Sequence, residues 1–325
     1  MQKKISLIIV LIFTTSVIFT SGCTNVQTGN GVAITEFYTD FEQVLPGEKV
    51  DFYVKMQNLG SKTATNVFGE LFGLDSAWYS NDANLGEGPW VGQEKLPNEI
   101  ECRYTENKHF SLSPPNQMFG TPGQEHICTW TYKAPNMDHG MTASYEPKIR
   151  VFYDYETSAD IGVVLVPREE MIRLQNNGDT PDAHIISKSS SPVDIDIQLQ
   201  SPIRVSENTV SFLMETTVTN SGDGVTCLKG RCKNIGSSES LTGMLTLTIN
   251  IPENSDLSFD CEGAPKCSLK SMETVIQLYK GTNMIIQRIN ANLKDITTQQ
   301  TRTIKINLDY SYFTEKTISV KVVSD

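Results

Sequence analysis

Short runs of alternating apolar and polar residues, separated by turn residues, are the feature that most constrains how this chain can fold. In Val193-Asp-Ile-Asp-Ile-Gln-Leu199, the apolar side chains would lie on one face of a strand and the polar side chains on the other. Turn formers such as Pro46-Gly47 and Lys280-Gly281 separate runs of this kind. The pattern predicts an all-β fold of antiparallel sheets, each with one buried face and one face in water.

The strand-like runs recur along most of the sequence. They are residues 32–41, 66–74, 127–132, 193–199, 243–251, 274–278 and 283–293. One segment, residues 167–175, instead fits a helix, because Pro167 suits its first turn and Asn176-Asn-Gly178 ends it. The polar stretch that follows indicates a linker, so residues 168–191 are expected to be a short helix and an interdomain linker.

Two parts of the sequence resemble each other. Residues 50–60 and 210–222 each have the pattern of a strand that ends in Asn-x-Gly, which favours a turn. A chain of 325 residues is also too long for one average domain. We therefore predict two tandem immunoglobulin-like antiparallel β-sandwiches, residues 31–167 and residues 192–325.

The ends of the two halves also match. Residues 149–155 and 304–310 both finish in Asp-Tyr, and each is followed by a polar stretch and a final apolar run. We interpret Asp154-Tyr155 and Asp309-Tyr310 as equivalent residues placed before a hairpin turn. A duplicated pair of this kind favours a structural role over a catalytic one.

The N-terminus has the layout of a secretory signal. Two lysines precede an apolar run from Ile5 to Phe19, and small residues follow. A run of about 15 residues is short for a helix that crosses the hydrocarbon core, which takes about 20. Residues 1–22 are therefore predicted to be a signal peptide, and residues 24–325 are expected on one side of the membrane.

Cys23 adds a more specific meaning to this signal. The sequence Thr20-Ser-Gly-Cys23 resembles the lipobox of prokaryotic lipoproteins, in which the cysteine receives a lipid and becomes the new N-terminus. That family prefers Leu, Val or Ile where this chain has Thr20, so a signal without lipid, cleaved or retained, is the alternative. Residues 23–30 are small and polar, as a tether would be. The resemblance implies an exported protein anchored by lipid at the outer face of the cell membrane.

Six further cysteines remain once Cys23 is set aside. They are Cys102, Cys128, Cys227, Cys232, Cys261 and Cys267. An even number suits the oxidising compartment that a signal peptide implies, so we expect disulfides. Many pairings are open in principle. The division into halves favours Cys102 with Cys128, and the local choice in the second half is Cys227 with Cys232 and Cys261 with Cys267.

The alternative for the last four cysteines is a structural zinc site. Such sites usually separate the cysteines of each pair by about two to four residues, and here the gaps are four and five residues. Export also argues against zinc-bound thiolates. The four histidines, His109, His126, His139 and His184, lack ligand spacings such as HExxH. We therefore expect no metal and no cofactor.

Residues 34–67 carry a resemblance to a known family. The run from Ile34 through Val44-Leu-Pro-Gly-Glu-Lys-Val50 to Asn58-Leu-Gly60 and Val67 resembles the first strands of CARDB-like and S-layer-associated immunoglobulin-like domains. These domains are common on archaeal and bacterial cell surfaces. The resemblance implies a fold and an adhesion, scaffold or interaction role, and it carries no active-site residues.

Residues 75–124 form a long insertion in the first predicted sandwich, rich in Gly, Pro and Asn. Segments of this length are usually functional or disordered. The aromatic candidates for a ligand site in or beside it are Trp78, Trp90, Tyr104, Phe110 and Phe119. They predict either a platform for a polypeptide or a sugar or a minor core packed over the end of the sandwich.

Charge and motifs limit the remaining functions. The net charge is −11 without a basic cluster, which argues against nucleic-acid binding. The sequence has no GxSxG, GxxxxGK[ST] or GxGxxG motif. The leading hypothesis is a non-enzymatic, membrane-anchored surface lipoprotein that acts as an interaction or scaffold module with other envelope proteins. The alternatives are a ligand-capturing surface receptor that uses residues 75–124, and an envelope hydrolase with a site between the domains.

Overall fold

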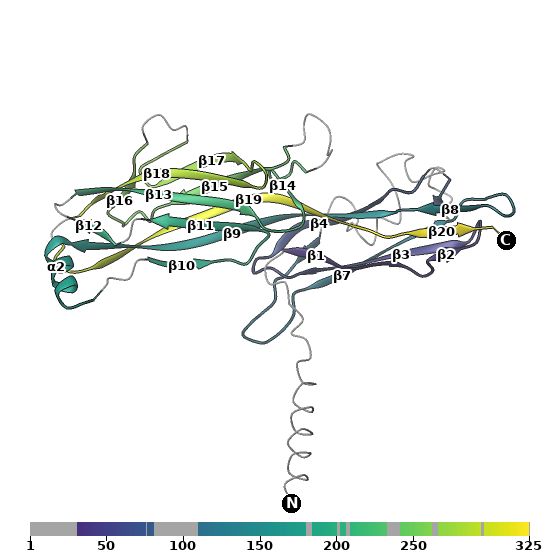
Figure 1. Cartoon of the computed structure of the whole chain (residues 1–325), viewed down its shortest axis with the longest axis horizontal. Coiled ribbons are helices and arrows are strands. Elements are labelled where there is room, and N and C mark those ends of the chain that lie inside the picture. Colours follow the sequence, from purple (N-terminus) through teal and green to yellow (C-terminus); the bar gives the residue numbers. More distant parts are fainter. Residues whose placement is uncertain are drawn as a thin grey trace, which may run out of the picture.

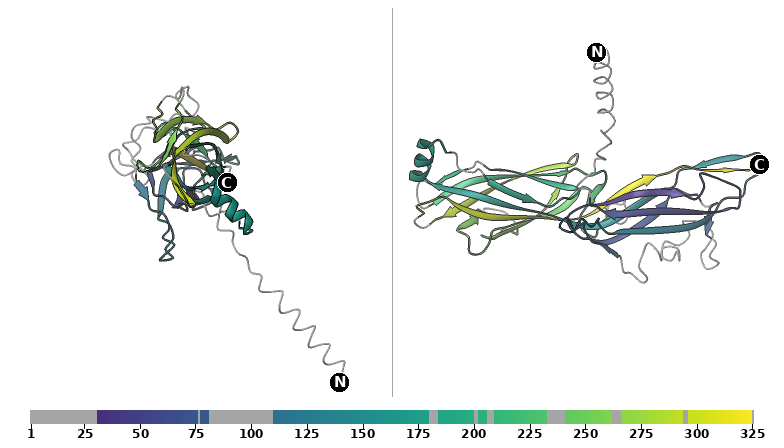
Figure 2. Two further views of the ribbon diagram at one scale, coloured as in Figure 1. Left: turned by 90° about the vertical axis from the view of Figure 1, so that its left-hand side faces the viewer. Right: turned by 90° about the horizontal axis from the view of Figure 1, so that it is seen from below.

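The computed structural model describes residues 31–75, 77–80, 110–179, 184–199, 202–205, 209–232, 241–261, 266–293 and 296–324. This part of the chain is mostly β-strand in several sheets, mainly antiparallel, and has one helix, so the prediction of an all-β fold is confirmed. Figure 1 shows an elongated molecule. In Figure 2, helix α2 (Arg168–Asn176) lies at one end and β20 (Val320–Val323) near the other.

The N-terminal half of the described chain contains nine strands. They are β1 (Val32–Thr39), β2 (Gln43–Val44), β3 (Lys49–Asn58), β4 (Ala64–Phe72), β5 (Tyr79–Ser80), β6 (Phe110–Leu112), β7 (Glu125–Lys133), β8 (Thr142–Tyr145) and β9 (Lys148–Pro167). The C-terminal half contains β10 (His184–Lys188), β11 (Val193–Leu199), β12 (Ile203–Val205), β13 (Thr209–Asn220), β14 (Val225–Cys227), β15 (Met244–Asn250), β16 (Leu257–Phe259), β17 (Ser271–Gln277), β18 (Thr282–Asn292), β19 (Gln300–Thr317) and β20.

The same order of strands occurs in both halves. One sheet has the order β1-β3-β7-β5 and another has the order β11-β13-β18-β16. The largest sheet has the order β17-β15-β19-β9-β4-β6. Its first three strands come from the C-terminal half and its last three from the N-terminal half, in mirrored order. The internal repeat inferred from residues 50–60 and 210–222 therefore corresponds to β3 and β13, the second strands of the two four-stranded sheets.

The two halves are joined through β9 and β19. These strands pair antiparallel from Lys148–Thr317 to Leu165–Gln300, and Asp154 lies opposite Ser311 near the middle of the pair. On either side of that point Tyr153 faces Tyr312, and Tyr155 faces Tyr310. We call Tyr153–Tyr155 and Tyr310–Tyr312 the waist of the molecule.

The hairpin turns predicted after Asp154-Tyr155 and Asp309-Tyr310 are wrong. β9 continues without a break through residues 156–160, and β19 continues to Thr317. Residues 156–160 keep the two-residue alternation of a strand, because Glu156 and Asp160 are exposed while Thr157 and Ala159 are buried. Polar residues in this stretch mark the solvent side of a long strand and do not form a turn.

Two other segments differ from the predicted domain division. Within the expected linker, residues 184–188 form β10, which pairs antiparallel with β9. β20, at the end of the expected second sandwich, pairs with β8 and β2 of the N-terminal half. Helix α2 lies where the sequence predicts a helix, with each end displaced by one residue.

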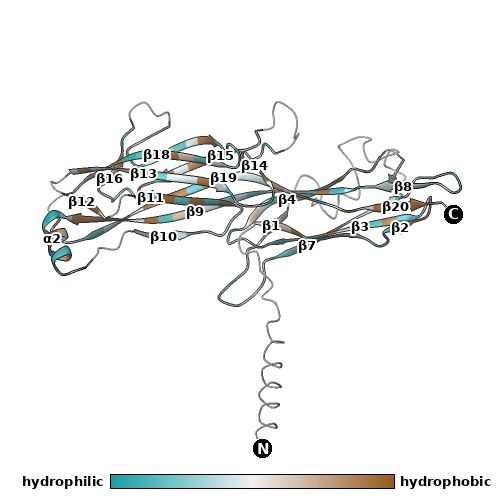
Figure 3. Cartoon of the chain, in the orientation of Figure 1, coloured by the Kyte–Doolittle hydropathy of each residue, from teal (hydrophilic) through white to brown (hydrophobic). Residues whose placement is uncertain are grey.

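Alternation of side chains builds the buried core between the sheets. On β3 the residues Val50, Phe52, Val54 and Met56 are fully buried, and the intervening residues are half-buried. Figure 3 shows the same two-residue pattern of hydrophobic and hydrophilic positions along the C-terminal strands. Most of the buried apolar residues of the two halves belong to one continuous cluster that passes through the waist.

Candidate functional site

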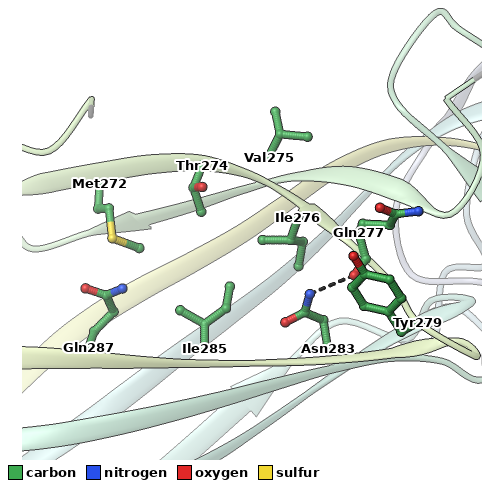
Figure 4. Close-up of a pocket in the computed structure, with 9 residues that line it drawn as sticks. All are labelled: Met272, Thr274, Val275, Ile276, Gln277, Tyr279, Asn283, Ile285 and Gln287. Carbon is green, nitrogen blue, oxygen red and sulfur yellow. Dashed lines mark hydrogen bonds between the residues drawn. The ribbon is translucent and has the colours of Figure 1, made fainter. Parts of the chain in front are cut away.

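A groove between β17 and β18 is one of the concave sites in the described part of the chain. A tight turn joins the two strands, closed by backbone hydrogen bonds between Tyr279 and Thr282 of 3.0 and 3.1 Å. Beyond the turn the strands diverge into different sheets. Figure 4 shows Met272, Thr274 and Ile276 above the gap, facing Asn283, Ile285 and Gln287 below it. The groove has a volume of about 410 Å³.

The lining of this groove is neutral. The nine residues are Met272, Thr274, Val275, Ile276, Gln277, Tyr279, Asn283, Ile285 and Gln287, none of which is acidic or basic. Met272 and Ile276 are buried on the inner side, whereas Val275 is 50% and Tyr279 71% exposed. In a chain with a net charge of −11, an uncharged surface of this kind favours a neutral, largely apolar ligand.

One edge of β17 borders the groove and has no neighbouring strand among the described residues. β17 is the edge strand of the largest sheet. The amide of Leu278, the residue that follows β17, donates to the Gly243 carbonyl on the β15 side. The Glu273 amide instead donates to the Lys266 carbonyl at 3.2 Å, on the side away from β15. The Asn283 side chain donates to the Gln277 carbonyl at 2.7 Å. The main-chain groups of Glu273, Val275 and Gln277 therefore face away from β15.

In the N-terminal half, the equivalent gap is closed by Phe110 of β6 and His126 of β7, whose rings lie 4.2 Å apart. The position of His126 follows from the turns after β3 and β13. Asn58 ends β3 and Asn220 ends β13. Two residues before Asn58, Met56 pairs with His126. Two residues before Asn220, Val218 pairs with Asn283. His126 and Asn283 are therefore equivalent.

Phe110 and Ile276 are equivalent by the same reasoning on the other sheet. Val67 of β4 pairs with Phe110, and Leu245 of β15 pairs with Ile276. The next residue after Val67, Phe68, pairs with Phe152 of β9, three residues before Tyr155. Likewise, the next residue after Leu245, Thr246, pairs with Asp309 of β19, three residues before Tyr312. The open groove in the C-terminal half thus has Ile276 and Asn283 where the N-terminal half has two rings in contact.

The aromatic residues predicted to form a platform are distributed differently. Trp78 is fully buried, with edge contacts to Phe52 at 6.0 Å and Tyr145 at 5.3 Å between ring centres. This placement corresponds to the packing alternative. Phe110 is half-buried against His126. Trp90 and Tyr104 lie outside the described residues, so a platform that includes them stays a prediction.

Phe119 has a third environment, at the tip of a loop between β6 and β7. Phe119 is 74% exposed and its neighbour Met118 is 87% exposed. Asn116 holds the tip, because its side-chain oxygen accepts hydrogen bonds from the amides of Met118 and Phe119 at 3.1 and 3.3 Å. The backbone of Asn116 also pairs with Thr121 in both directions. The two large apolar side chains are therefore presented by an ordered turn.

Two of the expected disulfides are present. Cys227 bonds to Cys232, and Cys261 bonds to Cys267, with Cα atoms 5.3 and 5.6 Å apart. Cys128 is also disulfide-bonded. Cys23 and Cys102 lie outside the described residues, so the lipid site and the Cys102–Cys128 pair stay predictions.

Asp154 at the waist is the buried carboxylate that the sequence singled out. It accepts hydrogen bonds from the Asn66 side chain at 2.6 Å and from the Ser311 hydroxyl group. The Gly230 amide in turn donates to the Ser311 oxygen at 2.8 Å. Asp309 instead pairs with Lys229 near the surface. Asp154 and Asp309 therefore have different roles, and the contacts of Asp154 bind β4 to β9 and β19.

Two other kinds of site, a metal centre and a membrane-spanning helix, are absent from the described residues. No cluster of His, Cys, Asp and Glu there could hold a metal ion. Among the same residues, no helix has the length and apolar character needed to span a bilayer.

Comparison with known proteins adds little. No family model matches the sequence, and no curated protein matches it. Among solved structures, the chain is similar to the secreted serine protease VesC from Vibrio cholerae, at 8% sequence identity and a TM-score of 0.18. The alignment covers 86% of this chain and 50% of that chain, so this chain spans half the length of the protease it matches. A likeness of this degree carries no argument about fold or chemistry.

The groove residues were not among the candidates taken from the sequence. Residues 274–278 and the Lys280-Gly281 turn were recognised as a strand and a turn. Which strands border the gap depends on pairing across two sheets, and no local pattern encodes that pairing. The apolar side chain of Val275 in a strand otherwise polar on that face was the one available signal.

Proposed function

We propose that this protein is a non-enzymatic surface lipoprotein, anchored through Cys23 at the outer face of the cell membrane, that acts as an interaction or scaffold module. In this proposal each half is an immunoglobulin-like β-sandwich, and the two are arranged in tandem. The resemblance of residues 34–67 to CARDB-like domains, which are common on prokaryotic surfaces, supports this assignment.

The observation that carries the proposal is the pairing of β9 with β19. One uninterrupted antiparallel pair passes from one half into the other, and side-chain contacts at its centre bind both halves. Such a pair resists bending between the halves, because bending would break ladder hydrogen bonds. A stiff, elongated body of this kind suits a scaffold that holds partners at fixed separation.

The position of Gly31 also suits a tethered module. Gly31 lies at the waist, where its carbonyl accepts a hydrogen bond from the Leu59 amide at 2.7 Å and its α-carbon lies beside Tyr153 and Pro192. The eight residues 23–30 can span at most about 28 Å when extended. A lipid at Cys23 would hold the body by its middle and close to the bilayer, with both ends available to partners.

The disulfides support export. Cys227–Cys232 and Cys261–Cys267 each close a short loop, and disulfides persist mainly in oxidising compartments outside the cytosol.

The anchor is tested by intact-mass analysis of the native chain purified from the membrane fraction. The expected product begins at Cys23 and carries a lipid mass on that residue. The matched control is Cys23→Ser, which is expected to leave the membrane fraction. A mature chain that begins after Cys23, or an unmodified Cys23 in a membrane-bound chain, would remove the anchor from the proposal.

The second candidate is a ligand-capturing receptor, and the exposed Met118 and Phe119 are the observation that favours it. Residues 110–124, which contain this tip, have no charged side chain. Apolar side chains on an ordered, uncharged loop resemble the central contacts of many binding sites. Replacing both by serine should abolish capture of a surface ligand and leave the melting temperature nearly unchanged.

A further inference from the structure

We propose that the groove between β17 and β18 binds an extended, uncharged polypeptide segment, which adds to the largest sheet as a new strand beside β17. This inference rests on the proposed role as an interaction module and names the class of partner. The segment would place its inward-facing side chains in the groove and its main chain along the free edge of β17.

The main chain of β17 supplies the backbone recognition. The amide of Glu273 is bound by Lys266, and the carbonyl of Gln277 accepts from Asn283. Between them, no group in the described part of the chain bonds to the outward-facing amide and carbonyl of Val275. A residue opposite Val275 in an antiparallel strand would exchange two hydrogen bonds with it. Strand addition of this kind recognises an extended main chain.

β18 borders the groove with further main-chain groups, to which no residue in the described ranges bonds from the groove side. The Arg288 carbonyl accepts from the Asp260 amide on the edge away from β13, and Thr282 pairs with Tyr279 on that same edge. Met284 and Ile286 lie between these two residues at intervals of two. Along a strand, the main-chain groups of every second residue point to the same edge. Their amides and carbonyls therefore face the groove side. A strand in the groove would meet main-chain groups on both sides.

The side chains decide which segment fits. Met272, Ile276 and Ile285 supply the apolar part of the lining, and the side-chain amides of Gln277 and Gln287 supply its polar part. A charged side chain placed here would find no opposite charge among the nine lining residues, and its desolvation would oppose binding. A segment with apolar residues at alternating positions fits best.

The edge lacks the usual protection against pairing. Edge strands are commonly blocked by proline, by lysine or by a bulge. β17 has none of these, its register with β15 is regular over all seven residues, and its one charged side chain, Glu273, is bound to Lys266 at 2.6 Å. In the N-terminal half, Phe110 and His126 occupy the place where the proposed segment would insert.

A separate strand fits this site better than a second copy of the chain. In a pair of β17 strands from two copies, the inward-facing Met272, Thr274 and Ile276 of each copy already line its own groove. Such a dimer would extend the sheet and leave both grooves unfilled. A segment from another protein supplies its own side chains, which can fill the groove.

The experiment measures binding of a defined probe to the purified full chain. The probe is a capped heptapeptide of alternating threonine and valine, and the control peptide has proline at its centre. Calorimetric titration gives the dissociation constant, and hydrogen exchange reports on residues 271–277. We expect the probe to bind, to slow exchange in β17, and to bind at least about tenfold more tightly than the proline peptide.

Two variants connect this binding to the groove. Ile276→Phe with Asn283→His copies the closing pair of the N-terminal half and should weaken binding at least about tenfold. Val275→Pro removes the free amide but no bond to β15, because proline is tolerated at a sheet edge, and it should have the same effect. The matched control, Leu213→Thr, changes an exposed side chain on β13, which lies on the side of β18 away from the groove, and should leave the affinity unchanged.

The outcomes separate this inference from the proposed function. Absence of probe binding, or equal affinities in the wild type and in a folded Val275→Pro variant, would overturn the strand-addition site and leave the lipid anchor unaffected. Dimerisation in sedimentation that Val275→Pro abolishes would assign the edge to a second copy and overturn the inference as stated. A native mature chain that carries no lipid on Cys23 but binds the probe would retain the site and refute the anchor.

Discussion

Gly60 lies against the hydroxyl group of Tyr155 so closely that a β-carbon at residue 60 would overlap the tyrosine oxygen. Gly222 has the same relationship with Tyr312. Each tyrosine accepts a hydrogen bond from the turn that contains the glycine, from the Lys62 amide at 3.0 Å and from the Gly224 amide at 2.8 Å. The tyrosine hydroxyls therefore hold the two Asn-x-Gly turns against the waist.

This relationship corrects the alignment of the two halves. Asn58 donates to the Lys62 carbonyl and Asn220 to the Gly224 carbonyl, both at 2.8 Å, so the turns are equivalent. Tyr155 is therefore the counterpart of Tyr312. The sequence comparison instead matched Tyr155 with Tyr310, two residues away, because both follow an aspartate.

We expect Gly60→Ala to destabilise the protein by about 1–3 kcal/mol, the usual range for overpacking a buried site. The added methyl group must displace the Tyr155 hydroxyl and its hydrogen bond. Chemical denaturation of Gly60→Ala, Tyr155→Phe and the double variant measures the coupling. Removing the hydroxyl makes room for the methyl group, so the double variant should lose less than the sum of the single variants. Strictly additive losses would contradict the proposed overlap.

The waist tyrosines predict a loss of stability at alkaline pH. Burial raises the pKa of Tyr155 and of Tyr312 to about 12, and it raises the pKa of Tyr153 and Tyr310 as well. In the unfolded chain a tyrosine pKa is about 10. The folded protein thus holds the phenolic protons more tightly, and this contribution is complete below pH 10 and is lost as the pH rises towards 12.

The measurement is the free energy of unfolding in urea at several pH values from 8 to 11. Each buried tyrosine should contribute a slope of at most about 1.4 kcal/mol per pH unit above pH 10. Tyr155→Phe removes one titrating group and should make the decline shallower, although it also removes the bond from Lys62. A free energy that stays constant up to pH 11 would show that the tyrosines do not control alkaline stability.

Trp78→Ala should cost about 3–5 kcal/mol, the range for truncating a large buried aromatic residue, because Trp78 is fully buried between Phe52 and Tyr145. Phe119→Ser should change stability by less than about 0.5 kcal/mol, as is usual for an exposed site. Thermal denaturation of both variants distinguishes a packing role from a binding role. A stable Trp78→Ala variant would return Trp78 to the candidates for a ligand platform.

The Cys227–Cys232 disulfide belongs to a small cluster with Phe68, Phe152 and Phe313, on the face of the largest sheet near the waist. Replacing both cysteines by serine should cost about 2 kcal/mol from loop entropy alone. It should also expose the phenylalanine rings, so a dye that binds apolar surface should gain fluorescence. The matched control replaces Cys261 and Cys267, which are not in this cluster. Equal dye binding by both variants would contradict the covering role of the first disulfide.

The sequence by itself determined the features that depend on neighbouring residues. The alternation in residues 193–199 predicted β11 with its observed bounds, and the strand predicted at 127–132 lies within β7. Pro167 and Asn176-Asn-Gly178 located the helix to within one residue. The disulfides of the second half join cysteines five and six positions apart. In each case the cause is local: the period of side chains, the φ preference of a residue, or a short loop.

The tertiary structure alone decided how the strands pair. Residues 156–160 contain polar residues that suit a turn, but β19 pairs with them and keeps them extended. The groove likewise exists because Ile276 and Asn283 face each other where Phe110 and His126 meet in the other half. These pairs join residues that are far apart or lie in different sheets. Their contacts depend on the register of whole strands, which a local pattern of side chains cannot specify.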